Sequence, residues 1–310
     1  MVTQKPQKPQ KRLAVGELGC LLVFSFCLLA FPARGQHAIP GHWAGDSIAF
    51  SKARWECDTL VGVRFMHTHF TGREVFKSNQ YFTVVEIPRG ARHRLCFVAD
   101  PVRATVSAFA GQRNALAAVN GSYFDMHTGA PICYLRIGGR QLGINTPGRH
   151  DTVNRKYYQN ATIRLLPSGK PRFLIPDSLR MAESLLPDSN IMTAGPMLLL
   201  RGATVPQHTE KRFVSGRHNR TAIGLKPDGT VVLLVADGRC KGFAEGLTLT
   251  ELTLVMRWLG CCDAVNLDGG GSSTMYVRGK GEGGIVNHPS DNGRFDAQGQ
   301  RPVANAILVL

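Results

Sequence analysis

Hydrophobic positions along the chain fall mainly into short runs bounded by turn-forming residues, a pattern that predicts strands more often than helices. Residues 60–65 (LVGVRF) and 81–88 (YFTVVEIP) are rich in β-branched and aromatic side chains. Residues 220–225 (RTAIGL) and 230–239 (TVVLLVADGR) form two further apolar runs, separated by residues 226–229 (KPDG). Proline, aspartate and glycine in that order are typical of a turn, so these runs predict two strands joined by a short connection.

One segment instead has the spacing of a helix. In residues 248–260 (TLTELTLVMRWLG) the apolar side chains recur every three or four positions and therefore share one face. Thr248 and Glu251 have the spacing of a capping box in the first turn, and Gly260 stands where a helix commonly ends. This segment is the strongest helix prediction in the chain.

The remaining pattern predicts the fold class. Residues 115–125 (ALAAVNGSYFD) indicate a strand of small residues that stops at a turn, residues 263–268 (DAVNLD) a short strand, and residues 304–310 (ANAILVL) a last buried strand. Residues 126–190 are less regular and are interpreted as an insertion or a set of surface loops. Because hairpins outnumber strand–helix–strand units, we expect an α+β fold: a largely antiparallel or mixed β-sheet with packed helices in a single domain.

The N-terminus has the pattern of a targeting segment. Four basic residues precede residues 18–31, an apolar run that is long enough for a signal peptide and short for a membrane span. Ala33 and Gly35 occupy the −3 and −1 positions of a cleavage site after Gly35. We therefore expect a signal peptide over residues 1–35 and a periplasmic or secreted protein with no stable membrane span after cleavage. The alternative is an uncleaved anchor over residues 13–31.

Export changes how the cysteines are interpreted. Of the 8 cysteines, Cys20 and Cys27 lie in the signal segment, which leaves an even number in the exported part. An oxidising compartment allows disulfides between them, but the sequence does not select a pairing. No CxxC pair occurs, and the adjacent Cys261 and Cys262 lack the usual spacing of zinc ligands. The cysteines therefore predict no metal site.

The charge balance narrows the classes of partner. The formal net charge is +15, with the basic residues scattered along the chain. A basic exported protein favours anionic polymers such as phosphate-bearing glycans. Neither a recognisable nucleic-acid module nor a basic helix with aromatic residues is present, so we expect no nucleic-acid partner. The oligomeric state is not fixed by the sequence.

The stretch DGGGSS, residues 268–273, is the most unusual feature of the chain. Glycine lets a backbone take positive φ and approach a ligand closely, and successive amides in such a turn form a concavity that suits an anion. Ser272 and Ser273 add hydroxyl groups, while Asp268 stands at the end of a buried strand. The stretch therefore predicts an anion cradle with a carboxylate at its edge. A glycine-rich bulge between two strands is an equally good interpretation.

Polar residues also stand at the ends of other predicted strands. Asn120 ends one of them, Asp237 and Arg239 end another, and Arg220 and Thr221 begin a third. If these ends meet at one edge of the sheet, their side chains line one polar pocket.

The motifs carry a family resemblance. AVNGSYFD, TAGPML, RTAIGL, VADGR, GLTLTEL, AVNLDGGGSSTM and RPVANAI follow one another over roughly residues 90–310. Together they resemble the phosphodiester glycosidase domain family. The resemblance implies a hydrolase that cleaves the bond between a sugar anomeric carbon and a phosphodiester. It assigns residues 91–310 to the catalytic domain and leaves residues 36–90 as N-terminal strands packed on that domain.

The resemblance also assigns site residues and leaves the sugar open, with α-N-acetylglucosamine as one candidate. The positions it singles out are Asn120, Arg220, Thr221, Asp237, Glu251, Asp268, Gly269, Gly270, Gly271 and Ser272. Asp268 is the expected nucleophile or base, with Asp237 as the second candidate. We expect Arg220 to grip a phosphate in bidentate fashion and the three glycine amides to stabilise the leaving phosphate. Glu251 is a further catalytic candidate, although its spacing favours the capping box.

Several alternatives remain open. A phosphodiesterase would cleave the P–O bond instead, and a non-catalytic binder of anionic cell-surface glycan would use the same pocket. No cofactor is expected, although an acidic pocket edge suits Ca²⁺ or Mg²⁺. His67 and His69 would face the same side of a strand, where we favour packing or surface roles over a metal site.

Overall fold

The computed structural model describes residues 43–145, 159–175, 188–207 and 212–310. All of these residues belong to one compact unit, Gly35–Leu310. The signal peptide predicted for residues 1–35 lies outside the described residues and stays a prediction. Within the described ranges, no helix is long and apolar enough to cross a membrane.

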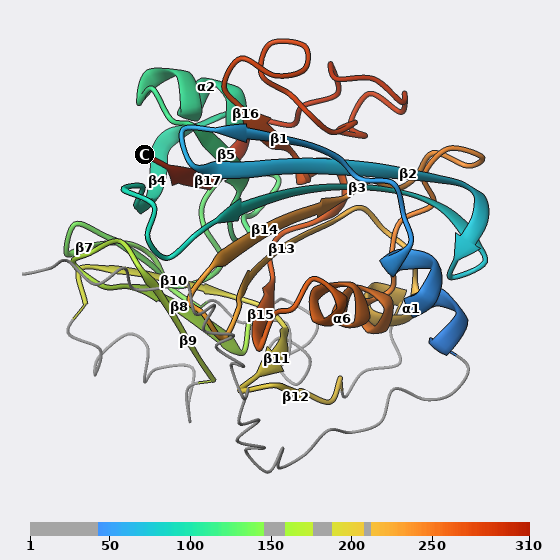
Figure 1. Cartoon of the computed structure of the whole chain (residues 1–310). Coiled ribbons are helices and arrows are strands. Elements are labelled where there is room, and N and C mark those ends of the chain that lie inside the picture. The colour runs from blue at the N-terminus through green and yellow to red at the C-terminus, as the bar shows by residue number, and fades with distance from the viewer. Residues whose placement is uncertain (1–42, 146–158, 176–187, 208–211) are drawn as a thin grey trace, which may run out of the picture. The chain divides into compact units, whose positions relative to one another are not determined.

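The largest element is an eight-stranded sheet in which every neighbouring pair is antiparallel (Figure 1). In spatial order its strands are β1 (Glu56–Leu60), β2 (Val63–Val75), β3 (Ser78–Ile87), β14 (Val231–Ala236), β13 (Arg220–Leu225), β15 (Asp263–Asn266), β11 (Met197–Leu200) and β12 (Ala203–Thr204). The N-terminal strands β1 to β3 thus continue the same sheet as β14 and β13.

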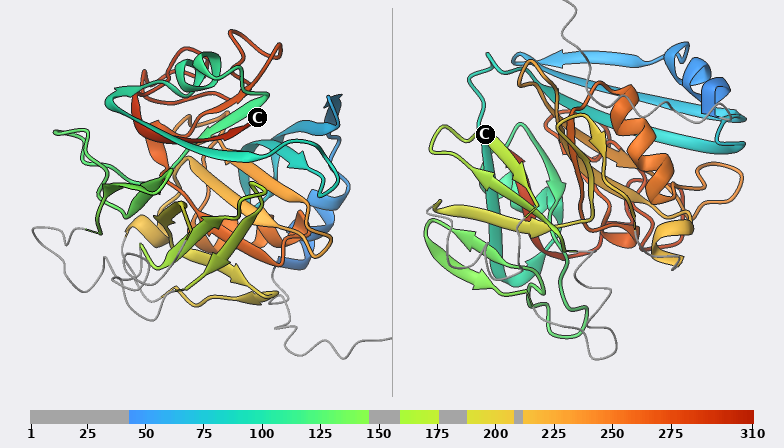
Figure 2. Two further views of the ribbon diagram at one scale, coloured as in Figure 1. Left: turned by 90° about the vertical axis from the view of Figure 1, so that its left-hand side faces the viewer. Right: turned by 90° about the horizontal axis from the view of Figure 1, so that it is seen from below.

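Two smaller antiparallel sheets complete the β structure. The four-stranded sheet contains β16 (Met275–Val277), β5 (Ala117–Asn120), β17 (Val303–Val309) and β4 (Leu95–Ala104). The five-stranded sheet contains β7 (Arg140–Gly143), β6 (Leu135–Ile137), β10 (Asn190–Ala194), β8 (Ala161–Leu165) and β9 (Pro171–Leu174). In Figure 2 (right), strands of these sheets lie on one side, and α6 and the long N-terminal strands lie on the other.

Short helices cover the sheets. The helices are α1 (Ala44–Ser51), α2 (Val106–Gln112), α5 (Arg212–Ser215) and α6 (Leu249–Trp258), with a 3₁₀ turn, η2, at Gly270–Ser272. Helix α6 begins at the predicted capping box: the Thr248 side chain accepts from the Glu251 amide, and the Glu251 carboxylate accepts from the Thr248 amide. Helices α1 and α6 lie side by side in Figure 1.

The centre of the eight-stranded sheet is buried on both faces, which explains the unbroken apolar run of β14. Val231, Leu233 and Val235 pack into a core shared with the two smaller sheets. Val232 and Leu234 point the other way, into a core shared with α1 and α6. A strand buried on both faces gains no advantage from polar alternation, so its sequence is apolar throughout. The expected α+β class, with largely antiparallel sheets and packed helices in a single domain, is confirmed.

Two local predictions were wrong. Residues 126–190, interpreted as an insertion or loops, contain β6 to β9 and the first residue of β10. These strands are short, and proline and glycine between them hide their period. The run at residues 60–65 is not one strand, because Val61 and Gly62 adopt positive φ values of 48° and 79° and turn the chain from β1 into β2.

Candidate functional site

Asp268 lies where the eight-stranded and four-stranded sheets meet. It follows β15, and its amide donates to the Gly121 carbonyl just after β5 at 3.0 Å. The amide of the preceding residue, Leu267, donates to the Thr221 carbonyl of β13 at 2.8 Å. Backbone hydrogen bonds from two sheets therefore fix the chain on both sides of the Asp268 side chain.

Asn120 and Thr221 build this junction and are not free to hold a substrate. The buried Asn120 side chain donates from Nδ2 to the Asp268 carbonyl at 2.7 Å. Its Oδ1 accepts from the Thr221 hydroxyl at 2.8 Å and from the Thr274 amide at 3.2 Å. Both were expected to bind substrate. The structure corrects this interpretation, because their polar atoms are occupied in positioning the loop that carries Asp268.

The glycine amides do not form the predicted cradle. The Gly269 amide donates to Asp268 Oδ1 at 2.8 Å, and the Gly270 amide donates to the Asn219 carbonyl at 2.9 Å. The Ser272 amide closes the 3₁₀ turn on the Gly269 carbonyl at 3.3 Å. Two of the three glycine N–H groups that were expected to face a phosphate are therefore consumed inside the protein.

The glycines instead allow close packing of other groups. A Cβ atom on Gly269 would lie 2.7 Å from the Asn219 carbonyl oxygen, and one on Gly270 would lie 2.6 Å from Nη2 of Arg239. A Cβ on Gly271 would collide with the guanidinium of Arg301. Gly270 also has a φ of +61°, which disfavours any other residue. Gly270 and Gly271 thus let two guanidinium groups pack against the loop, while Gly269 lets the Asn219 backbone approach.

Of these two arginines, Arg239 stands at a strand end that was expected to line the pocket, whereas Arg301 was not singled out from the sequence. Arg239 is exposed, follows β14, and itself has a positive φ of 60°. Arg301 precedes β17 and forms an ion pair with Asp291. Each stands in a motif that supported the family resemblance, VADGR and RPVANAI. An arginine beside a strand end was therefore the available signal, but the sequence did not show that the charges of both arginines lower the pKa of Asp268.

Asp268 has an unusual proton affinity. Burial raises its pKa to about 6, while the Ser272 hydroxyl, the Gly269 amide and the guanidinium groups of Arg301 and Arg239 act in the opposite direction. Part of the residue still reaches solvent. A desolvated yet accessible carboxyl group that titrates near neutral pH is suited to act as a base or nucleophile.

Ser272 lies beside this carboxyl group. Its side chain is fully buried, and its hydroxyl lies close enough to the Asp268 carboxyl group to lower the pKa of that group. Of the groups that lower the Asp268 pKa, the Ser272 hydroxyl has the largest effect. The predicted position of Ser272 in the site is thus consistent with the geometry, although its contact is with Asp268.

Arg220 is not placed to grip a phosphate in the expected way. Its guanidinium is buried, donates from Nε to the Leu247 carbonyl at 2.9 Å, and donates from Nη2 to the Phe213 and Gly216 carbonyls. Both bidentate edges of a guanidinium use Nη2, so neither is open. Burial lowers the Arg220 pKa to about 10, which still leaves the group charged at neutral pH. It acts as a buried cation behind the site.

Asp237, the second catalytic candidate, is fully engaged elsewhere. Its buried carboxylate accepts from Asn287 Nδ2 at 2.8 Å and from the backbone amide and Nδ1 of His288 at 2.9 and 2.8 Å. A carboxylate with three donors on its two oxygens is held in place and cannot move to a substrate carbon. Asp237 is therefore corrected from a catalytic candidate to a residue that orients His288.

Glu251 has the structural role that its spacing favoured. Besides the capping box, its buried carboxylate accepts from the Arg217 guanidinium, with 2.6 Å between Arg217 Nη2 and Glu251 Oε1. Arg217 also donates to the Phe76 carbonyl at 2.6 Å. These contacts tie α6 to the turn after β2, so Glu251 is not retained as a catalytic candidate.

No metal-binding cluster of three His, Cys, Asp or Glu side chains is found in the described ranges. His67 and His69 do face the same side of β2, and both rings contact Tyr81. The cysteines of the described residues are free, so the disulfides that export would allow are not formed in this structure.

The raised pKa of Asp268 predicts a pH-dependent stability effect of Asp268→Asn. Between about pH 4 and pH 6 the folded protein retains a proton that the unfolded chain releases, so wild-type stability falls as pH rises through this window. Asparagine does not ionise and escapes this loss. We expect the free energy of unfolding of the variant to rise relative to that of wild type by on the order of 1–3 kcal/mol between pH 4 and pH 7, measured by thermal or urea unfolding. An advantage that shrinks as pH rises would contradict it.

Comparisons with known proteins identify the family of the chain. A family model described as phosphodiester glycosidase matches residues 113–310. Mouse N-acetylglucosamine-1-phosphodiester alpha-N-acetylglucosaminidase is 28% identical over 250 residues, which cover 75% of this chain and 45% of the relative. The human enzyme of that name is 27% identical over 206 residues, covering 61% of this chain and 36% of the relative. The chain thus spans less than half the length of these curated relatives.

Solved structures show the same fold. The catalytic domain of the zebrafish enzyme of that name, auto-inhibited by its pro-peptide, superposes with a TM-score of 0.62 at 20% identity, covering 84% of this chain and 90% of that domain. A hypothetical protein from Synechocystis superposes with a TM-score of 0.57 at 15% identity, covering 83% of this chain and 63% of that one. Because the family model matches more than half of its residues, this chain belongs to the phosphodiester glycosidase family.

Proposed function

We propose that this protein hydrolyses sugar-1-phosphodiesters by cleaving the bond between the anomeric carbon and the phosphate oxygen. The observation that carries the proposal is one carboxyl group, Asp268, with a pKa of about 6 and two guanidinium groups, Arg239 and Arg301, beside its loop. A carboxylate addresses the electron-poor carbon, and guanidinium groups suit the phosphate that departs from it. The anomeric carbon and the phosphate therefore each face a group of complementary charge.

The leaving group explains how one catalytic carboxylate suffices. Glycosidases commonly use a second carboxyl group to protonate the departing oxygen. A phosphate ester departs as an anion, so it needs charge stabilisation more than it needs a proton. The guanidinium groups of Arg239 and Arg301 supply that charge stabilisation. The other two predicted carboxylates, Asp237 and Glu251, are engaged with His288 and Arg217. The proposed mechanism therefore has Asp268 attack the anomeric carbon or activate a water molecule there.

The proposed substrate is a phosphate-bearing glycan. The mouse and human relatives carry N-acetylglucosamine-1-phosphodiester in their names, so an α-N-acetylglucosamine-1-phosphodiester is the first compound to test. The net charge of +15 favours association with a polyanionic glycan. A divalent cation is examined in the same assay by adding and omitting a chelator.

We further propose that the protein acts after export to the periplasm or the medium. The support is the basic start of the chain, the apolar run at residues 18–31 and the small residues Ala33 and Gly35. N-terminal sequencing of the protein recovered outside the cytoplasm should begin at Gln36. Recovery of the intact N-terminus in the membrane fraction would support the uncleaved anchor instead.

Isotope labelling tests which bond breaks. Hydrolysis in ¹⁸O-labelled water should place the label on the sugar C1 hydroxyl, because water replaces the phosphate at carbon. Asp268→Asn should lower kcat/KM by about 10²–10⁴-fold, while Asp100→Asn, at a distant aspartate on β4, should not. Label in the phosphate would identify a phosphodiesterase. Absence of wild-type turnover, with glycan binding that survives Asp268→Asn, would identify a binding protein.

Two glycine variants test whether Arg239 depends on close approach to the loop. Gly270 and Gly138 have φ values of +61° and +58°, but only at Gly270 would a Cβ atom meet Arg239; nothing lies within 4 Å of one at Gly138. Both alanine variants should lose about 1–2 kcal/mol of stability from backbone strain. Gly270→Ala should also lose about 10²-fold in kcat/KM, whereas Gly138→Ala keeps its activity. Equal activity in the two variants would show that Arg239 does not need this contact.

A further inference from the structure

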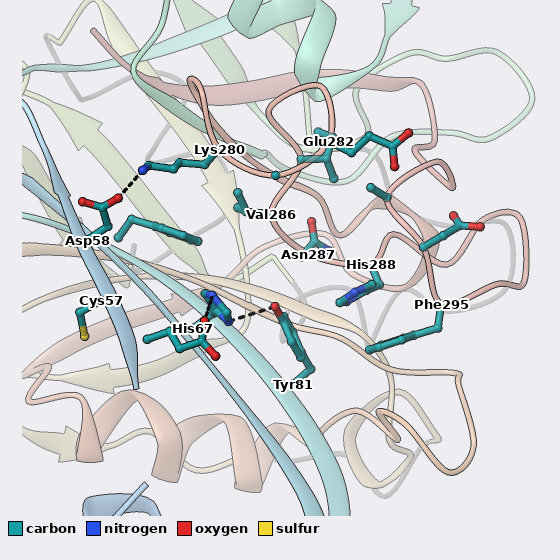
Figure 3. A pocket seen from close by; sticks show the side chains of 16 residues that line it. Cys57, Asp58, His67, Tyr81, Lys280, Glu282, Val286, Asn287, His288 and Phe295 are labelled. Atoms are coloured by element: carbon teal, nitrogen blue, oxygen red, sulfur yellow. Dashed lines mark hydrogen bonds and ion pairs between the residues drawn. The ribbon is translucent and has the colours of Figure 1, made fainter. Parts of the chain in front are cut away.

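A pocket whose lining does not include Asp268 lies beside strands β1 to β3. It has a volume of about 630 Å³ and is lined chiefly by His67, Tyr81, Lys280, Glu282, His288 and Phe295 (Figure 3). We name it the His288 pocket. Asp268, Arg239 and Arg301 are not among its lining residues. Its volume falls in the range of small-molecule sites.

His288 is held rigidly at the wall of this pocket. Its Nδ1 and backbone amide both bind the buried Asp237 carboxylate, and its ring stacks on Phe295 with centroids 3.7 Å apart. The Tyr81 ring meets the His288 ring edge to face at 4.7 Å. Since Nδ1 is taken by Asp237, Nε2 is the ring nitrogen left for a ligand. This arrangement presents one polar atom in a fixed direction.

The charges of the pocket oppose those of the Asp268 site. Its lining carries the carboxylates of Glu56, Asp58, Glu282 and Asp296 against one ammonium group, that of Lys280. In a protein with a net charge of +15, this is a local reversal of sign. A phosphate group would be repelled here, while the guanidinium groups near Asp268 attract it.

The pocket is also a poor site for an ammonium ligand. Asp58 pairs with Lys280, Glu56 lies 3.4 Å from His67, and Asp296 accepts from Asn292 at 2.8 Å. An aromatic cage for a cation needs open ring faces. Here the ring of Phe295 stacks on both His288 and Phe243.

We propose that the His288 pocket binds an uncharged sugar ring. Sugar hydroxyls donate and accept, and the lining offers both kinds of partner. The Glu282 carboxylate and Nε2 of His288, whose Nδ1 donates to Asp237, are acceptors, and the Lys280 ammonium group is a donor. Phe65, Ile285 and Val286 supply apolar surface for the C–H face of a ring. The proposal does not depend on the chemistry at Asp268.

The pocket has two walls of different origin. One wall comes from strands before the residues that the family model matches, and the other is hydrogen-bonded to the loop that carries Asp268. Glu56, Phe65, His67 and Tyr81 belong to β1, β2 and β3, which precede the matched residues 113–310. On the opposite wall, Asn287 donates both to Asp237 at 2.8 Å and to the Ser273 carbonyl at 3.2 Å. A bound sugar would thus sit behind the loop that carries Asp268, where it can hold a glycan near the reaction.

Binding of phosphate-free sugars tests the proposal. Glucose, N-acetylglucosamine and its β-linked dimer are titrated into the protein, with glucosamine and inorganic phosphate as charged comparisons, and binding is followed by calorimetry and NMR. At least one uncharged sugar should bind, and Asp268→Asn should bind it within twofold of wild type. That result would stand even if no phosphodiester were hydrolysed, so the two proposals fail separately.

Pocket variants locate the binding. Ala297 lines the pocket, and Ala297→Trp should fill it and weaken binding at least tenfold; Ala203→Trp, on exposed β12, should stay within twofold. His288→Asn keeps an amide near the Nδ1 position for Asp237 and removes Nε2, so it should weaken binding about tenfold. Absence of binding by every uncharged sugar, preference for glucosamine, or unchanged binding in Ala297→Trp would each overturn the proposal.

Discussion

The site depends on one side chain, that of Asn120. It ends a strand of the four-stranded sheet, yet its amide binds the Asp268 carbonyl, the Thr221 hydroxyl of the eight-stranded sheet and the Thr274 amide. All of these groups are buried, so each would lose a partner with no water to replace it if Asn120 moved. The Asn120 amide therefore adds side-chain bonds between the two sheets and the loop to the backbone bonds of Leu267 and Asp268. Asp268 owes its position to this junction more than to its own contacts.

The glycine run shows how packing, rather than amide donation, can require glycine. An anion cradle of backbone amides and close packing of guanidinium groups both predict that a side chain at Gly270 or Gly271 is not tolerated, but for different reasons. In the structure the space that a Cβ atom would take is filled by the guanidinium groups of Arg239 and Arg301. Positive charge thus reaches the loop through long side chains from other strands. Because guanidinium groups carry a full charge, they stabilise a phosphate more strongly than neutral amides do.

The sequence predicted elements whose signal is local and missed those whose signal is not. The capping box of Thr248 and Glu251 lies within four residues, and it formed as expected. The family motifs located Asp268 and its glycines. Nothing in the sequence shows, however, that Asn120 faces Thr221, since these residues are separated by 101 positions. The partners of Asn120, Arg220 and Asp237 therefore differ from those expected: a polar residue at a strand end can face a ligand or another strand, and only the fold decides.

Asp268 and Asp237 show how different surroundings give two similar residues different properties. Both follow strands of the same sheet, but Asp237 receives three hydrogen bonds and holds His288, whereas the carboxyl group of Asp268 receives one from the Gly269 amide. Few donors and burial leave Asp268 with a pKa near 6, and so with a proton to exchange. The residue with fewer partners is therefore the one that we propose as the reactive group. The better satisfied residue shapes a neighbouring pocket whose charge is opposite, so that one molecule offers separate places for a phosphate and for an uncharged ring.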